Sequence, residues 1–240
     1  MKRAPSLLLF ACTLLATAPA LAANVVVRFT TVLGDYDVEL CTEISDACPG
    51  VAPITVANFL AYVDQDVYPP TMFIHRRGAG GPSPLVIQGG GYWVNASDQV
   101  AAVPQFDPIA LELGANLSNV RGTIAMARLG GADTGTATNQ WFINLVDNVN
   151  LDTVGGGYAV FGKVVSGLDT VDAIGALQIY PFQSPFGELP LLPGYPGGDV
   201  SPTPYFVYVS QIARVPEPDA VAAACGAAIA LTALAVRRRA

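Results

Sequence analysis

Short segments in which apolar and polar residues alternate recur along this chain, and they restrict its fold more than any other feature of the sequence. In Asn24–Leu40, two alternating runs are joined by Leu33-Gly34-Asp35. This predicts a β-hairpin, because alternation places the apolar side chains on one face of each strand. Residues 68–92 contain two further strand-like segments. Others lie at 121–129, 140–145, 158–165 and 205–212. The chain is therefore predicted to be mainly β.

Two segments carry the spacing of helices instead. Apolar residues fall at i, i+3, i+4 and i+7 from Val56 within Pro53–Asp64, and they recur at helical spacing from Leu168 to Leu177. Seven or eight strands with two isolated helices predict a closed eight-stranded antiparallel barrel with an α-helix over each open end. Residues 178–204 carry many Pro and Gly residues and predict a long surface excursion.

The composition argues against two kinds of binding site in the segment between the apolar ends. Residues 24–214 contain 7 Lys and Arg against 17 Asp and Glu, a net charge of −10. A domain this acidic is a poor candidate for binding nucleic acid. The chain has one histidine and 4 cysteines, so a metal site such as a multi-ligand zinc site is not expected. Nothing in the sequence indicates oligomerisation, and a monomer is expected.

The first 23 residues have the features of a secretory signal peptide. The basic start Met1-Lys2-Arg3 precedes an apolar run from Leu7 to Ala18 and the small-residue cleavage pattern Ala20-Leu21-Ala22. We therefore expect residues 1–23 to be removed and the domain, residues 24–214, to be exported across the inner membrane. An uncleaved anchor helix is the alternative interpretation of the same run.

Residues 215–240 have the features of a sorting tail. Val215-Pro216-Glu217-Pro218 precedes the uncharged stretch Ala220–Val236 and the basic end Arg237-Arg238-Arg239. In this order the features resemble the PEP-CTERM tail of Gram-negative bacteria, which implies a transmembrane helix that an exosortase removes. The protein would be anchored in the membrane transiently and would end in the envelope, on the cell surface or in the medium. A plain membrane anchor is the alternative.

Export bears on the state of the cysteines. Cys12 and Cys225 lie in the apolar ends, whereas Cys41 and Cys48 lie inside the domain. In an oxidising compartment we expect Cys41 and Cys48 to form a disulfide that closes a small surface loop. Two free thiols are the alternative.

The segment Tyr68–Tyr92 carries the most informative polar residues. It contains the only histidine, His75, beside Arg76 and Arg77, and an apolar run that ends in Gln88-Gly89-Gly90-Gly91. A cation and a carboxamide near strand ends, beside apolar residues, suit contacts with a polypeptide backbone. No nucleophile and base lie together here, so the segment does not indicate hydrolysis.

Six pieces of the sequence, in order, resemble the cyclophilin family of peptidyl-prolyl cis-trans isomerases over about residues 25–212. They are Asn58-Phe59-Leu60, His75-Arg76, Gln88–Gly91, Arg121–Ala127, Asn139–Asn144 and Tyr158–Val164. The resemblance implies a cyclophilin-like barrel with two capping helices, in agreement with the periodicity. It also implies that the partners are proline-containing polypeptides. No cofactor is expected, because isomerisation makes and breaks no bond.

The resemblance further implies roles for individual residues. Arg76 would be the catalytic guanidinium that stabilises the twisted prolyl amide. Gln88 would bind the substrate backbone and help to orient Arg76, and Gln140 would contact the residues before the proline. The remaining substrate-binding residues would be Leu85, Met126, Phe142 and Leu151, around the proline ring, and Tyr158, near the substrate carbonyl. His75 is expected to be structural rather than a general base.

Residue types alone leave other interpretations open. Arg76 could pair with a surface carboxylate, and the apolar residues could be ordinary core. The segment from Arg76 to Leu85 is longer than is usual in the family, and Leu85 replaces an aromatic residue. These departures motivate a second hypothesis, in which a cyclophilin-fold module binds proline-containing peptides at the cell envelope with little catalysis. A third is an inert surface scaffold. The leading hypothesis is an exported prolyl isomerase that assists protein folding.

Overall fold

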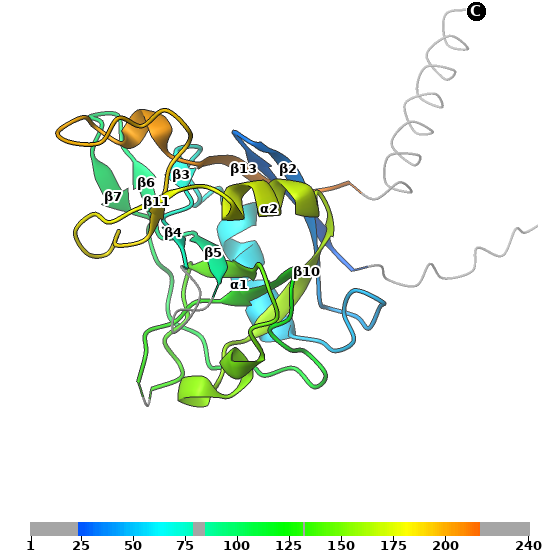
Figure 1. Cartoon of the computed structure of the whole chain (residues 1–240). Coiled ribbons are helices and arrows are strands. Elements are labelled where there is room, and N and C mark those ends of the chain that lie inside the picture. The colour runs from blue at the N-terminus through cyan, green and yellow to red at the C-terminus, as the bar shows by residue number, and fades with distance from the viewer. Residues whose placement is uncertain (1–23, 79–84, 132, 217–240) are drawn as a thin grey trace, which may run out of the picture.

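The computed structural model describes residues 24–78, 85–131 and 133–216 (Figure 1). The expected signal peptide, residues 1–23, and the expected tail from residue 217 onward lie outside these residues, as do residues 79–84 between Arg76 and Leu85. Within the described ranges, no helix is long and apolar enough to cross a membrane.

The described residues form thirteen strands, two α-helices and three short 3₁₀ helices. The strands are β1 Val26–Thr31, β2 Gly34–Leu40, β3 Met72–Phe73, β4 Arg76–Arg77, β5 Val86–Gly89, β6 Tyr92–Val94, β7 Val100–Ala102, β8 Thr123–Met126, β9 Trp141–Asn144, β10 Val160–Ser166, β11 Ile179–Tyr180, β12 Leu189–Pro190 and β13 Tyr208–Arg214. The helices are α1 Pro53–Asp64, α2 Leu168–Gly175, η1 Val149–Asp152, η2 Val154–Gly156 and η3 Thr203–Tyr205.

Eleven strands form one curled antiparallel sheet, in the order β4-β5-β9-β8-β10-β2-β1-β13-β3-β6-β7 (Figure 1). The prediction of a mainly β fold with two α-helices is confirmed. The prediction of a closed eight-stranded barrel was wrong in detail, because the sheet has two edge strands, β4 and β7. Strand β4 is only two residues long. Beyond this edge, the Arg77 N–H bonds to the carbonyl of Glu188 at 2.9 Å, so the chain after α2 continues the pairing.

The two helices pack against different strands of the curled sheet. Helix α1 begins at Pro53, whose fixed φ suits a first helical turn. All four apolar residues of its predicted stripe are buried, and α1 packs against β10 and β13. Helix α2 buries Val171 and Ile174 and packs against β2 and β5. Residues of both helices and of the inner faces of the strands form the main core.

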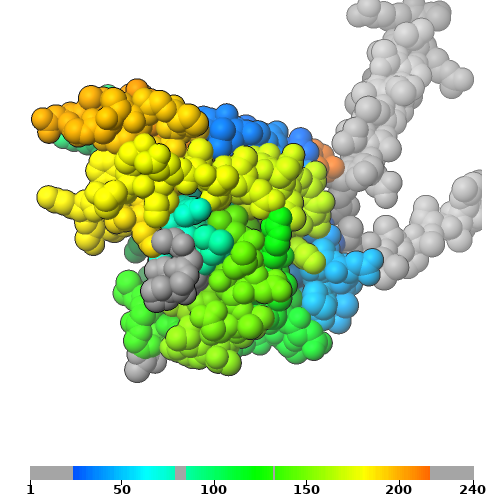
Figure 2. All heavy atoms as spheres, viewed as in Figure 1, coloured from blue at the N-terminus to red at the C-terminus, as the bar shows by residue number. Residues whose placement is uncertain are grey.

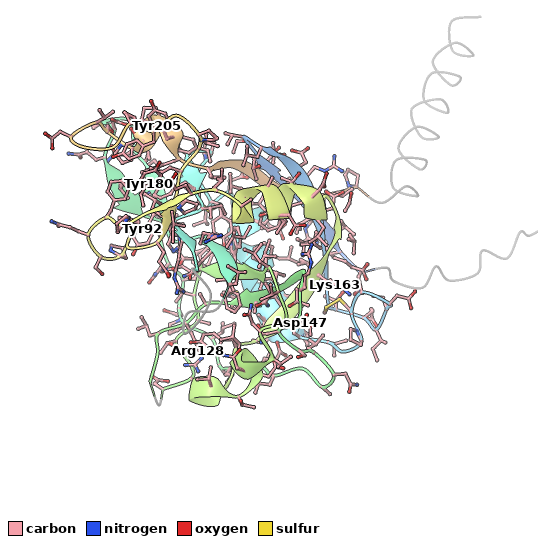
Figure 3. All side chains as sticks on the ribbon, in the orientation of Figure 1. Tyr92, Arg128, Asp147, Lys163, Tyr180 and Tyr205 are labelled. Atoms are coloured by element: carbon pink, nitrogen blue, oxygen red, sulfur yellow. A yellow bond between two sulfur atoms is a disulfide. The ribbon has the colours of Figure 1, made fainter. Side chains whose placement is uncertain are left out.

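Residues 178–204 contribute to a second aromatic core, which they share with residues of β3, β6 and Phe206 and which the prediction of a surface excursion did not include. Strands β11 and β12 pair in a separate two-stranded sheet. The ring of Tyr195 lies 5.0 Å from that of Tyr180 and 5.4 Å from that of Tyr205. Figure 3 labels Tyr180 and Tyr205. The buried members of this cluster are Phe73, Val94, Leu189, Leu191, Tyr195 and Phe206. The excursion is therefore packed against β3 and β6.

Cys41 and Cys48 form a disulfide just after β2, with their Cα atoms 5.2 Å apart. Both residues are buried. The bond closes a short loop that precedes α1.

Candidate active site

A cavity of about 340 Å³ opens on the outer face of the sheet, where β4, β5 and β9 lie side by side. Its lining combines two arginine cations, two carboxamides, a histidine and several apolar or aromatic side chains. The lining residues are His75, Arg76, Val86, Gln88, Tyr92, Ala127, Arg128, Gln140, Phe142, Leu151, Tyr158 and Pro185. Six of the predicted site residues are thus brought together: Arg76, Gln88, Gln140, Phe142, Leu151 and Tyr158.

Two predicted lining residues, Leu85 and Met126, do not line this cavity. Met126 is 1% exposed and belongs to the main core, and Leu85 packs against the same core. The cavity is lined by their neighbours Val86 and Ala127 instead. Successive side chains on a strand point to opposite faces, so an error of one residue moves a side chain from the cavity to the core. The substrate-binding roles of Leu85 and Met126 therefore stay predictions, and Val86 and Ala127 are the residues that line this cavity.

The two carboxamides are joined directly. Gln88 donates a hydrogen bond from Nε2 to Oε1 of Gln140 at 2.9 Å. Space for the Gln140 side chain comes from the glycines after Gln88, because a Cβ added to Gly91 would lie 2.8 Å from Cδ of Gln140. Gly90 has a φ of +85°, a left-handed conformation that favours glycine. The Gly-rich motif therefore permits a close approach between this turn and Gln140.

Arg76 lies opposite Gln88 on the neighbouring strand, since the two residues are paired in the β4–β5 register. The sequence predicted that Gln88 helps to orient Arg76. The structure also gives Arg76 a carboxylate partner, because its Nε lies 2.8 Å from Oε2 of Glu188. A guanidinium carries five N–H groups, and this contact uses one of them. Arg76 both pairs with a carboxylate and lines the cavity, so the two interpretations of this residue do not exclude one another.

The apolar part of the cavity is formed by a small cluster outside the main core. Phe142 and Leu151 are each 5% exposed and pack with Val86. The ring of Tyr158 meets that of Phe142 edge-on, with 5.8 Å between ring centres. The result is an apolar surface beside the polar groups of Arg76 and Gln88.

Arg128 is a lining residue that the sequence analysis did not identify. Its Cζ lies 4.8 Å from the centre of the Tyr158 ring, a cation–π contact. Its guanidinium also donates to the backbone carbonyls of Leu129, Gly155 and Gly157. Figure 3 labels Arg128 beside the short helical turns η1 and η2. Arg128 thus connects the end of β8 to the glycine turn that precedes Tyr158.

A network of buried and half-buried polar side chains supports the helical turn that carries Leu151. Asp152 accepts hydrogen bonds from the backbone and side-chain N–H groups of Asn119, both at 2.8 Å, and from the hydroxyl of Ser118. Burial raises the pKa of Asp152, but these hydrogen bonds outweigh it and lower the pKa below its ordinary value. Asn119 in turn accepts from Asn144 of β9 at 3.2 Å. The network ties η1 to the sheet.

His75 precedes Arg76 in the chain, also lines the cavity and is 3% exposed. Burial, together with the charge of Arg76, lowers its pKa from 6.5 to about 3, although a hydrogen bond with Gln140 acts in the opposite direction. Its Nδ1 has no partner among the described residues. The ring packs edge-on against Tyr92, with centres 5.0 Å apart. His75 is therefore neutral at physiological pH, which agrees with a structural role.

This arrangement can bind an extended backbone and an apolar ring side by side. Gln88, Gln140 and Arg76 offer hydrogen-bonding groups, and Phe142, Leu151 and the other apolar lining residues offer a surface of suitable character for a proline ring. Among the described residues there is no group of three or more His, Cys, Asp or Glu side chains arranged to bind a metal ion.

Comparison with known proteins shows the family of this chain. The family model described as cyclophilin type peptidyl-prolyl cis-trans isomerase/CLD matches residues 26–186. The chain belongs to this family. A peptidyl-prolyl cis-trans isomerase of Acinetobacter baylyi is 41% identical over 163 residues, which cover 67% of this chain and 77% of the relative. Peptidyl-prolyl cis-trans isomerase A of Dickeya dadantii is 39% identical over 180 residues, covering 71% and 84%.

Solved structures agree on the cyclophilin fold. A crystal structure of a cyclophilin type peptidyl-prolyl cis-trans isomerase from Cryptosporidium parvum matches with a TM-score of 0.55 and 21% identity, over 81% of this chain and 99% of that one. The predicted resemblance to the cyclophilins is confirmed, and this protein is a cyclophilin-type peptidyl-prolyl isomerase. The family match ends at residue 186, so it does not include Glu188.

Proposed function

We propose that this cyclophilin assists the folding of exported proteins by isomerising their prolyl bonds, and that Arg76 is its catalytic residue. The observation that carries the proposal is the position of Arg76, which lines the same cavity as Gln88, Phe142 and Leu151. The reaction requires a guanidinium beside an apolar surface that can hold a proline ring.

The requirement follows from the chemistry of the amide. Resonance gives the X–Pro bond partial double-bond character, and rotation faces a barrier of about 18–20 kcal/mol. In the twisted state the nitrogen regains a lone pair, which can accept a hydrogen bond. A catalyst must therefore bind the twisted amide better than either planar form. Arg76 would donate to the nitrogen, while Phe142 and Leu151 keep the ring in place and the preceding carbonyl rotates.

The remaining polar residues have positions that suit substrate binding. Gln88 and Gln140 would bind the backbone around the proline through their carboxamides. Tyr158 lies against Phe142 and would donate its hydroxyl to a substrate carbonyl. No group has to accept or release a proton in this reaction, so a neutral His75 presents no obstacle.

The proposed place of action depends on the ends of the chain and on the disulfide. Residues 1–23 have the features of a signal peptide, and the tail from residue 215 resembles a sorting signal for an exosortase. The Cys41–Cys48 disulfide is stable in oxidising compartments. In this proposal the tail anchors the protein in the membrane transiently, and its substrates are exported polypeptides. If export is blocked, Cys41 and Cys48 should remain reduced.

One observation favours a second candidate function. The Nε–H of Arg76 is already directed at Glu188, and this contact could keep the guanidinium from the substrate. The domain would then bind proline-containing segments at the envelope with little catalysis.

Exchange spectroscopy on a proline peptide separates the two functions. The purified protein should accelerate cis–trans exchange, and Arg76→Ala should reduce kcat/KM by about 100-fold or more, as expected for the loss of a group that stabilises the transition state. Peptide binding by the wild type without acceleration of exchange would support the second function instead.

A further inference from the structure

We propose that Glu188 is a positioning residue for catalysis: its carboxylate fixes the orientation of the Arg76 guanidinium in the cavity. The inference deepens the proposed role of Arg76 and rests on it. Glu188 lies 112 positions after Arg76, beyond the part of the chain that matches the family model.

The contact between the two side chains is short and partly shielded from water. Nε of Arg76 and Oε2 of Glu188 lie 2.8 Å apart, and the side chains are 32% and 23% exposed. The backbone places Glu188 for this contact, because its carbonyl accepts the N–H of Arg77 at 2.9 Å. The carboxylate therefore starts from a fixed point next to β4.

Glu188 directly precedes β12, in the hairpin that β11 and β12 form. Other groups anchor this hairpin. The ring of Phe186 lies 4.9 Å from that of Tyr92 and 6.1 Å from that of Phe73. Leu189 is buried in the second aromatic core. In Figure 2, the yellow atoms of this part of the chain lie next to the cyan-green atoms of β4 and β5. Removing the Glu188 carboxylate should therefore leave the hairpin in place.

Bonding at Nε has a specific consequence for an arginine. The guanidinium is planar, so fixing Nε restricts the plane in which both terminal nitrogens lie. Those nitrogens carry the other four N–H groups. A long, flexible side chain that is not restrained would populate orientations in which no N–H points at the substrate amide. Errors of about 1 Å in the position of a catalytic group can reduce rates strongly.

The test compares Glu188→Ala with Glu188→Gln, whose carbonyl oxygen can still accept the Nε–H. We expect Glu188→Ala to reduce kcat roughly fivefold at nearly constant KM, in line with the modest strength of a partly exposed pair. Glu188→Gln should remain within about twofold of the wild type. In ¹⁵N NMR spectra, the Arg76 Nε–H should exchange slowly with water in the wild type and in Glu188→Gln, and rapidly in Glu188→Ala.

Three outcomes would overturn the inference. Wild-type or higher kcat in Glu188→Ala would mean that the carboxylate does not orient Arg76 productively or withholds it from the substrate. A higher KM at constant kcat would assign Glu188 to the substrate-binding surface. Equal losses in Glu188→Ala and Glu188→Gln would assign the effect to the charge and not to the hydrogen bond.

Two further variants separate this inference from the proposed function. Asp37→Ala is the control, because it breaks an ion pair of the same length: Nε of Arg28 lies 2.8 Å from Oδ1 of Asp37. Neither residue lines the cavity, so this variant should leave kcat unchanged. Adding Glu188→Ala to Arg76→Ala should have no further effect on kcat. If Arg76→Ala alone retains wild-type kcat, both proposals fail. If Arg76→Ala loses activity and Glu188→Ala does not, only the positioning role fails.

Discussion

The side chains of Gln88 and Gln140 are joined by a hydrogen bond of 2.9 Å in the lining of the cavity. Gln88 belongs to β5, whereas Gln140 directly precedes β9, the strand paired with β5. Both residues line the cavity next to Arg76. Two carboxamides that orient each other present their remaining donors and acceptors to a bound peptide in a defined arrangement.

The first prediction concerns Gly91, over which the Gln140 side chain lies. In Gly91→Ala the new Cβ would lie 2.8 Å from Cδ of Gln140, so the flexible carboxamide should move and lose its bond to Gln88. One neutral hydrogen bond contributes about 1 kcal/mol, so we expect KM for a proline peptide to rise roughly fivefold. The melting temperature should change little. Unchanged KM would show that the Gln88–Gln140 contact does not contribute to binding.

Gly90→Ala provides the matched comparison at the neighbouring position. The residue has a φ of +85°, and an added Cβ would lie 2.3 Å from the backbone oxygen of Asn139, which cannot move as a side chain can. We expect a loss of about 2 kcal/mol or more in the free energy of unfolding. Urea denaturation should therefore distinguish Gly90→Ala, which loses stability, from Gly91→Ala, which loses affinity.

The second prediction concerns Arg128 and the glycines before Tyr158. Gly155, Gly156 and Gly157 all have positive φ, and three successive glycines are flexible unless other groups restrain them. Arg128 bonds to the carbonyls of Gly155 and Gly157 and stacks on Tyr158. We expect Arg128→Ala to reduce kcat/KM about fivefold and to accelerate hydrogen exchange of the Gly157 and Tyr158 amides. Arg128→Lys should recover little, because an ammonium lacks the planar set of donors.

Arg121→Ala is the control for this experiment. It removes an exposed arginine that pairs with Asp172 at 2.6 Å and does not line the cavity. Its kcat/KM should equal that of the wild type. Normal amide exchange at Gly157 in Arg128→Ala would contradict the proposed restraint.

The sequence predicted the local elements of this fold well, because each depends on residues close together in the chain. The α1 stripe from Val56 has a clear period, and Pro53 marks its start. The six family pieces included Arg76, Gln88 and Gln140, all of which line the cavity. The strand faces were less certain, because Val86 and Ala127 line the cavity next to Leu85 and Met126, the two residues that the resemblance indicated. Side chains alternate between the two faces of a strand, so a lining residue at Gln88 indicates that Val86, two positions earlier on β5, also faces the cavity.

Other features depend on contacts between distant segments, and no local pattern reveals them. Glu188 reaches Arg76 only because the backbone of the excursion bonds to β4. The second aromatic core collects residues from β3, β6 and the excursion, none of which shows a hydrophobic period of its own. The β4 edge of the sheet arises in the same way, since the excursion continues the pairing beyond it. Three-dimensional packing, not propensity, decides these features.

The third prediction concerns the Cys41–Cys48 disulfide, which joins residues seven positions apart. The chain-entropy model gives about 2.5 kcal/mol of stabilisation for a loop of this size. Reduction should therefore lower the free energy of unfolding by about this amount and leave kcat/KM unchanged, because neither cysteine lines the cavity. Urea denaturation with and without reductant measures the effect. The Cys41→Ala/Cys48→Ala variant should not respond to reductant, and a reduced wild type as stable as the oxidised form would refute the prediction.

The fourth prediction concerns stability at acidic pH, through the only histidine of the chain. His75 has a pKa of about 3 when folded, mainly because of burial, and about 6.5 when unfolded. Between these values the unfolded state binds more protons, so the contribution of His75 to stability is greatest above pH 6.5 and declines as the pH falls towards 3. From pH 7 to pH 5 the untagged protein should lose about 2 kcal/mol in the free energy of unfolding. Urea denaturation across this range measures how the free energy of unfolding changes with pH. In His75→Gln, the free energy of unfolding should be nearly independent of pH, whatever its value at pH 7. An equally steep decline in His75→Gln would attribute the pH dependence to other groups.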